Sequence, residues 1–146
     1  MLNVAVTIVD HAKEARERYD KAARAGIVAS SQYLLNEIKK AYSDYYTSGA
    51  FRSTLQIRQA WRRATPEKKD GQWYTIVGVP TASVTPKGAT KPVDRGEVAL
   101  AWELGHDNLY TGKRERVRIA QPTAVESAQG MRDEWAKIVK RYMEAP

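Results

Sequence analysis

Residues 11–47 of the chain read HAKEARERYDKAARAGIVASSQYLLNEIKKAYSDYYT. Small and apolar residues recur in this stretch at spacings of three and four, which is the period of one face of an α-helix. The face is made of small residues up to Ser31 and mainly of Tyr, Leu and Ile beyond it. The period predicts one helix of about 35 residues, roughly 50 Å long, and Gly26 is the natural place for a bend. The small-residue half favours close packing against a sheet or a neighbouring subunit.

A second helical period closes the chain. Ala124, Ala128, Met131 and Trp135 lie on one face at spacings of three and four. Pro122 precedes them, and proline is favoured at the first position of a helix because its missing N–H would have no partner there. The sequence therefore predicts that Pro122 opens an amphipathic C-terminal helix.

Strand patterns lie between the two helices. Ile57–Thr65 and Gln72–Val79 are rich in strand-forming residues and flank a turn that contains Asp70-Gly71, a pair typical of tight β-hairpins. Glu97–Leu104 reads as a third strand, and Val117–Ala120 as a short fourth. These patterns predict a small antiparallel sheet.

Residues 80–96 show neither a helical nor a strand period and hold several prolines and glycines. A segment of this kind inside a compact domain is uncommon and is usually functional or disordered, so we expect a long mobile loop. Together the patterns predict a single α+β domain over residues 1–146, in which the long N-terminal helix and the C-terminal helix pack on a small antiparallel sheet.

Composition narrows the possible functions. The chain has 146 residues, a net charge of +7 and no cysteine. The lack of cysteine excludes disulfides, a thiol nucleophile and a cysteine-based zinc site, and the sequence has no glycine-rich phosphate loop. No run approaches the length of about 20 apolar residues that a membrane span needs. We therefore expect no membrane partner and no cofactor.

One acid–histidine cluster invites a catalytic hypothesis. Glu103, His106 and Asp107 could serve a metal-dependent hydrolase, with the imidazole as base or ligand. The spacing matches no established metal motif, and Gly105-His106-Asp107 is also ordinary turn composition. We expect the chain not to be an enzyme.

The excess of positive charge suggests nucleic acid as an alternative partner. Arg58, Arg62 and Arg63 lie near Trp61 and Trp73 in sequence, and cations interleaved with aromatic rings can bind phosphates and stack on bases. A basic nucleic-acid-binding domain is therefore the alternative function. A solvated basic surface without such a partner accounts for the same charges, because acids are interspersed among them.

Three short motifs occur in a fixed order along the chain. They are Ser48-Gly49-Ala50-Phe51-Arg52-Ser53 after the first helix, Trp102-Glu103-Leu104-Gly105 at the expected end of a strand, and Val117-Arg118-Ile119-Ala120-Gln121-Pro122 before the last helix. In this order and spacing the chain resembles the tail-completion proteins of long-tailed bacteriophages, also called tail-terminator or head–tail joining (neck) proteins. The residues that match the family motifs are Gly49, Phe51, Arg52, Trp102, Glu103, Gly105 and Pro122.

The resemblance implies a structural virion protein that is assembled in the host cytoplasm and belongs to the neck of the tail. It would form a homo-oligomeric ring, expected to be a hexamer, that ends growth of the tail tube. Its partners would be the tail-tube protein, the head-side connector or stopper protein, and the DNA that passes through the ring. We expect the assembly interface to use basic residues of the predicted loop and of the segment before Pro122, namely Lys87, Lys91, Arg95, Lys113, Arg114, Arg116 and Arg118.

Overall fold

The computed structural model describes residues 12–47, 57–85, 90–107, 112–115 and 118–145. Helix α1 (Ala12–Thr47) is one continuous helix of 36 residues, about 54 Å long. The prediction of a long helix is confirmed, but the bend expected at Gly26 is wrong. Gly26 serves a different purpose: a Cβ atom placed there would lie 2.7 Å from Cδ1 of Trp135, so glycine allows that indole to lie against the helix.

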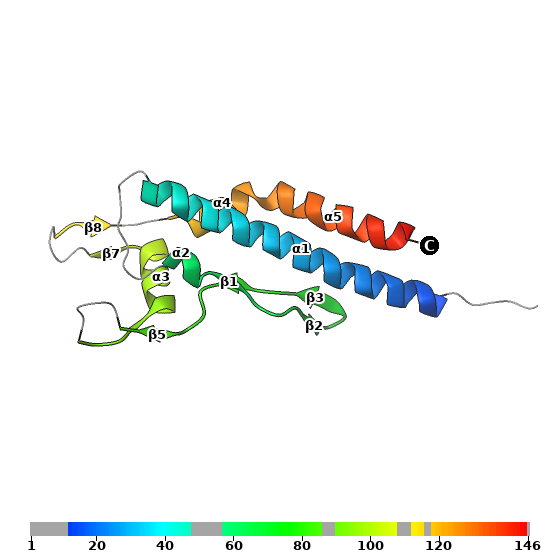
Figure 1. Ribbon diagram of the computed structural model, residues 1–146, viewed down its shortest axis with the longest axis horizontal. Helices are drawn as coiled ribbons and strands as arrows, with labels where there is room; N and C mark the ends of the chain where they lie inside the picture. Colours follow the sequence, from blue (N-terminus) through cyan, green and yellow to red (C-terminus); the bar gives the residue numbers. More distant parts are fainter. Residues whose placement is uncertain (1–11, 48–56, 86–89, 108–111, 116–117, 146) are drawn as a thin grey trace, which may run out of the picture.

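Two helices, α4 (Ala120–Glu126) and α5 (Ala128–Glu144), run back along α1 in the antiparallel direction (Figure 1). The expectation that Pro122 opens the last helix is wrong. Pro122 is the third residue of α4, and α5 begins only after Ser127. A proline is tolerated in this first turn because the backbone N–H at that position has no acceptor within the helix.

The predicted hairpin is present, but its strands are short and interrupted. The tip consists of β2 (Glu67–Lys69) and β3 (Gln72–Tyr74), joined by Asp70 and Gly71 with φ values of 51° and 78°. Such a turn matches the twist of the flanking strands. The base consists of β1 (Arg62–Arg63) and β4 (Val77–Gly78). The first predicted strand was too long, because α2 (Ile57–Ala60) takes up its start.

The strand predicted over residues 97–104 is a helix, α3 (Arg95–Leu104). The Asp94 carboxylate caps its first turn by accepting the backbone N–H groups of Gly96 at 2.7 Å and Glu97 at 3.1 Å. Gly105, with φ 101°, ends it and donates its N–H to the carbonyl of Ala101 at 2.8 Å. The apolar run is rich in alanine and leucine, which favour helix once both ends are capped.

Two further antiparallel strand pairs replace the loop and the fourth strand that we expected. Residues 80–96 contain β5 (Ser83–Val84) and β6 (Val93–Asp94), which pair with each other, together with the start of α3. Next, β7 (His106–Asp107) pairs with β8 (Arg114–Glu115). The strand expected over 117–120 is wrong where it is described, since Ala120 begins α4. The described strands form separate two-stranded pairs and not one sheet.

The core lies where the C-terminal half of α1 meets α3 and the start of α4. Its buried members are Leu35, Ile38, Tyr42, Trp61, Ala99 and Ile119. The rings of Tyr42 and Trp61 pack with centroids 6.0 Å apart. The described chain is thus α+β, as the sequence predicts, with small β-pairs attached to a helical body (Figure 1).

Candidate assembly site

Glu103 joins two of the three sequence motifs in space. Its Oε1 accepts the backbone N–H groups of Ile119 at 3.1 Å and Ala120 at 2.8 Å, and Oε2 accepts that of Gln121 at 3.4 Å. These groups belong to the start of α4, where N–H groups have no acceptor within the helix. The hydroxyl of the fully buried Tyr42 also donates to Oε1 at 3.4 Å. A carboxylate of α3 therefore fixes both the start of α4 and the end of α1.

The remaining motif residues lie in α3, at its end, in α4 or outside the described residues. Trp102 lies in α3, and Gly105 ends that helix with a backbone conformation that favours glycine. Pro122 lies in the first turn of α4. Gly49, Phe51 and Arg52 lie outside the described residues. The second and third motifs are therefore parts of one scaffold, and the first motif stays a prediction.

The predicted basic interface falls on two of the β-pairs and their flanks. Lys91 is exposed just before β6, and Arg95 is the first residue of α3. Lys113 and Arg118 are exposed on either side of β8, which contains Arg114. Lys87 and Arg116 lie outside the described residues. Both pairs project from the end of the molecule that carries α3 (Figure 1).

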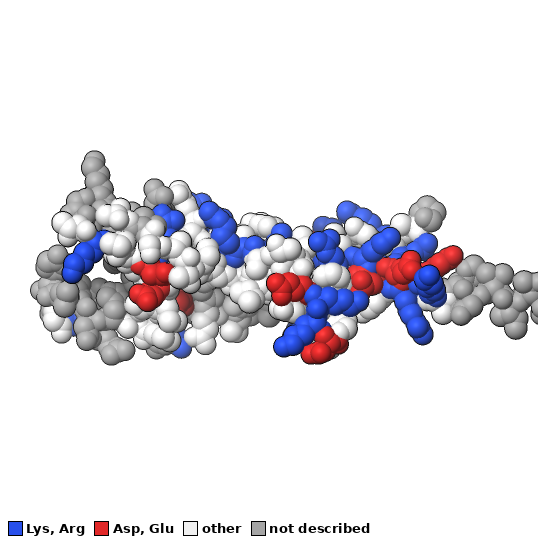
Figure 2. Space-filling view, turned by 90° about the horizontal axis from the view of Figure 1, so that it is seen from below, with Lys and Arg blue, Asp and Glu red and all other residues white. Residues whose placement is uncertain are grey.

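A second group of charges lies at the opposite end of the molecule. Figure 2 shows Lys and Arg side chains gathered where α1 begins, with acidic side chains between them. The residues include Lys13, Glu14, Arg16, Glu17 and Arg18. This mixture is typical of a solvated helix surface. Acidic residues, among them Asp94, Asp107 and Glu115, are likewise interspersed among the cations of the two β-pairs.

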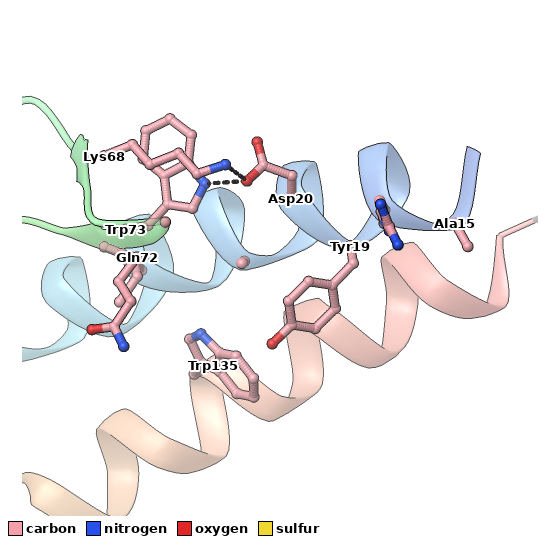
Figure 3. A pocket seen from close by; sticks show the side chains of 11 residues that line it. Ala15, Tyr19, Asp20, Lys68, Gln72, Trp73 and Trp135 are labelled. Carbon is pink, nitrogen blue, oxygen red and sulfur yellow. Dashed lines mark hydrogen bonds and ion pairs between the residues drawn. The ribbon is translucent and has the colours of Figure 1, made fainter. Parts of the chain in front are cut away.

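Asp20 attaches the β2–β3 hairpin to α1. Its Oδ1 accepts the indole N–H of Trp73 at 3.0 Å and a hydrogen bond from the Lys68 ammonium group (Figure 3). The hydrogen bond from Lys68, followed by that from Trp73, lowers the pKa of the Asp20 carboxyl below its usual value. Arg24 and Lys68 lie 5.6 and 5.8 Å from the centroid of the Trp73 ring. At the same hairpin, a hydrogen bond to Glu67 raises the pKa of the Tyr74 hydroxyl.

Two open grooves lie beside the seam between α1 and α5. The first, which we call the hairpin groove, has a volume of about 640 Å³ and lies between α1, the β2–β3 hairpin and α5 (Figure 3). The second, the seam groove, has a volume of about 490 Å³. Trp135 lines both. The side chains that line the seam groove are Ser30, Leu34, Ala124, Ala128, Met131, Arg132 and Trp135.

The sequence analysis missed the contact that shapes these grooves. Trp135 of α5 lies against Gly26 of α1, and Tyr33 of α1 lies against Gly130 of α5. Each glycine lets a large ring from the other helix approach the backbone. The signal in the sequence was the small-residue stripe of the first helix, which predicted a close neighbour but did not identify it.

The structure removes one support of the nucleic-acid alternative. Trp61 is only 8% exposed and packs in the core, so it cannot stack on a base at the surface. Trp73 is half-buried and engaged by Asp20, Lys68 and Arg24. The tryptophans that the sequence placed beside Arg58, Arg62 and Arg63 therefore have structural roles.

The acid–histidine cluster also loses one of its two carboxylates. Glu103 is committed to the start of α4, where both of its oxygens accept backbone N–H groups. Among the residues that the structure describes, no group of three His, Asp or Glu side chains could hold a metal ion. The side chains of His106 and Asp107 lie outside that description.

No helix within the described ranges combines the length and the apolar character that crossing a membrane requires. Comparison with known proteins gives no match: no family model, no curated protein and no solved structure is similar to this chain.

Proposed function

We propose that this chain is a structural subunit of a homo-oligomeric ring at the head-proximal end of a bacteriophage tail, where it ends tube growth and joins the tail to the head connector. The resemblance of the three ordered motifs supports this function. The Glu103 contacts add to it, because they make the second and third motifs interdependent parts of one scaffold.

One observation carries the proposal: in the described residues, large apolar side chains that are exposed outnumber those that are buried. The buried ones are Leu35, Ile38, Tyr42, Trp61 and Ile119. The exposed ones are Tyr19, Tyr74, Ile76, Leu100, Leu104, Val125, Tyr142 and Met143. Exposed apolar side chains mark sites of protein association where they are contiguous, as Leu100 and Leu104 are, one turn apart on α3. A subunit that neighbouring copies complete in a closed ring is expected to have such side chains.

The β5–β6 and β7–β8 pairs, with the Lys and Arg residues beside them, lie where they can contact a partner. Both project from one end of the body, where they can reach beyond the ring that the helices would form (Figure 1). Exposed cations beside the two pairs, Lys91, Lys113 and Arg118, can bind an acidic protein surface or the DNA in the channel. We propose these pairs as the joining surface.

Native mass spectrometry and negative-stain imaging of the full chain, alone and with polymerised tail-tube protein, test the proposal. We expect rings of a single copy number, either in solution or on tube ends. A chain that stays monomeric in solution and binds no tube contradicts the proposal.

Charge reversal tests the joining surface separately. Lys91→Glu combined with Arg118→Glu should leave ring formation intact and reduce head joining, because both side chains are exposed beside the two β-pairs. Lys21→Glu is the matched control, since Lys21 is exposed on α1 away from them. If the double variant joins tails to heads as efficiently as the control does, the β5–β6 and β7–β8 pairs are not the joining surface.

A further inference from the structure

Helix α3 presents an apolar ridge that the described part of the chain leaves exposed. Leu100 and Leu104 are 58% and 59% exposed and lie one turn apart on the same face, with Glu97 one turn earlier. The other face of the helix packs on the core through Ala99, which is 6% exposed. The ridge is therefore a rigid row formed by one carboxylate and two leucines.

The seam groove offers the complementary features on a different part of the molecule. Its walls are mainly apolar, from Leu34 of α1 and Met131 of α5, and Arg132 is the one charged residue among the described residues that line it. The wall from Ala128 to Trp135 is about 10 Å long. The two leucines of the ridge are about 6 Å apart along the axis of α3, so both fit within this length.

A single chain cannot bring the two surfaces together. In Figure 1, α3 lies on one side of α1 and α5 lies on the other. Among the described residues, no other segment of the chain fills the seam groove. The charges match as well, since Glu97 extends the ridge and Arg132 lines the groove.

We propose that the α3 ridge of one subunit inserts into the seam groove of a second copy, with Glu97 facing Arg132 of that copy. This inference rests on the proposed ring and identifies the contact that would build it. The two surfaces differ, so the interface is head-to-tail, and each subunit keeps one ridge and one groove free for further neighbours. Repetition of such a contact generates a ring when the rotation closes.

Complementary variants test the contact by sedimentation velocity. Leu100→Ser with Leu104→Ser removes the ridge, and Met131→Asp places a charge in the groove. Each variant alone should lose self-association. An equimolar mixture should form a one-to-one heterodimer and nothing larger, because only one intact ridge and one intact groove remain in each pair. Ala136→Asp is the matched control for Met131→Asp, since Ala136 is exposed on the same helix and does not line the groove.

Charge reversal gives a second test that does not alter the apolar groove. Glu97→Arg or Arg132→Glu alone should weaken self-association at least tenfold, and the double reversal should restore most of it. Both side chains are exposed, so folding is preserved.

The outcomes separate this inference from the proposed function. Rings that persist in the leucine double variant, or a mixture that does not dimerise, overturn the ridge-and-groove contact and leave the ring proposal standing. A wild-type chain that does not self-associate in solution or on tubes overturns both.

Discussion

Glu103 connects three helices through one side chain. It accepts backbone N–H groups from Ile119, Ala120 and Gln121 and the hydroxyl of the buried Tyr42. Glu103→Ala removes this acceptor from several polar groups at once. We expect the free energy of unfolding in urea to fall by about 2–3 kcal/mol. Glu103→Gln, which keeps one acceptor oxygen, should cost about 1 kcal/mol.

Glu144→Ala provides the control for Glu103. Its carboxylate lies 3.8 Å from Lys140 on an exposed face of α5, and such pairs contribute little to stability. If Glu103→Ala is as stable as this control, Glu103 does not hold the start of α4.

Asp20 makes the contact between the β2–β3 hairpin and α1 depend on pH. Its pKa is lowered by hydrogen bonds from Lys68 and Trp73 in the folded chain. The ionised Asp20 therefore stabilises the hairpin contact fully above about pH 3.9, the ordinary pKa of an aspartate. This stabilisation is lost as the pH falls through the lower pKa that Asp20 has in the folded chain. The indole N–H resonance of Trp73 should report this transition with a midpoint below 3.9. The transition should disappear in Asp20→Asn. A midpoint above that value would contradict the assigned contact.

At the scale of the elements, the α1–α5 seam depends on a glycine that the helix itself does not favour. Alanine at position 26 gains about 1 kcal/mol of helix propensity, but its Cβ would meet Trp135 at 2.7 Å. We expect Gly26→Ala to destabilise the chain by about 1–3 kcal/mol in thermal or urea unfolding, because overpacking outweighs propensity. Gly26→Ala combined with Trp135→Leu should recover part of the loss. A stabilised single variant would show that the two helices do not pack this closely.

The elements also show how far the sequence predicts the fold. The first helix was predictable because its period is sustained over many turns, and the Asp70-Gly71 turn because few residue pairs favour two positive φ values. Helix α3 was mistaken for a strand because a short apolar run fits either structure. Its capping residues, Asp94 and Gly105, were the available signal. The two-residue strands are too short to show any period.

The candidate site was predictable to a smaller extent. Motif order singled out Glu103, but its hydrogen bonds to α4 depend on how α3 packs, which the sequence does not state. The grooves depend on Trp135 meeting Gly26, residues that are far apart in the chain. Contacts of this kind follow from tertiary packing and leave only a compositional trace, such as the small-residue stripe of α1.

At the scale of the whole molecule, the described chain has a helical body, two β-pairs with Lys and Arg residues beside them at one end, and several exposed large apolar side chains (Figure 1). Those features fit a subunit that folds on its own and whose exposed apolar side chains are covered by neighbouring copies. We therefore propose that the chain functions in assembly. Leu100 and Leu104 of α3 would meet the seam groove of a neighbouring copy, and the β5–β6 and β7–β8 pairs would face the head.

Electron microscopy of growing tail tubes with the labelled chain added tests this account most directly. We expect label at one end of each tube only, and we expect labelled tubes to stop lengthening. Tubes that continue to lengthen, with the chain unbound or bound along their sides, would contradict it.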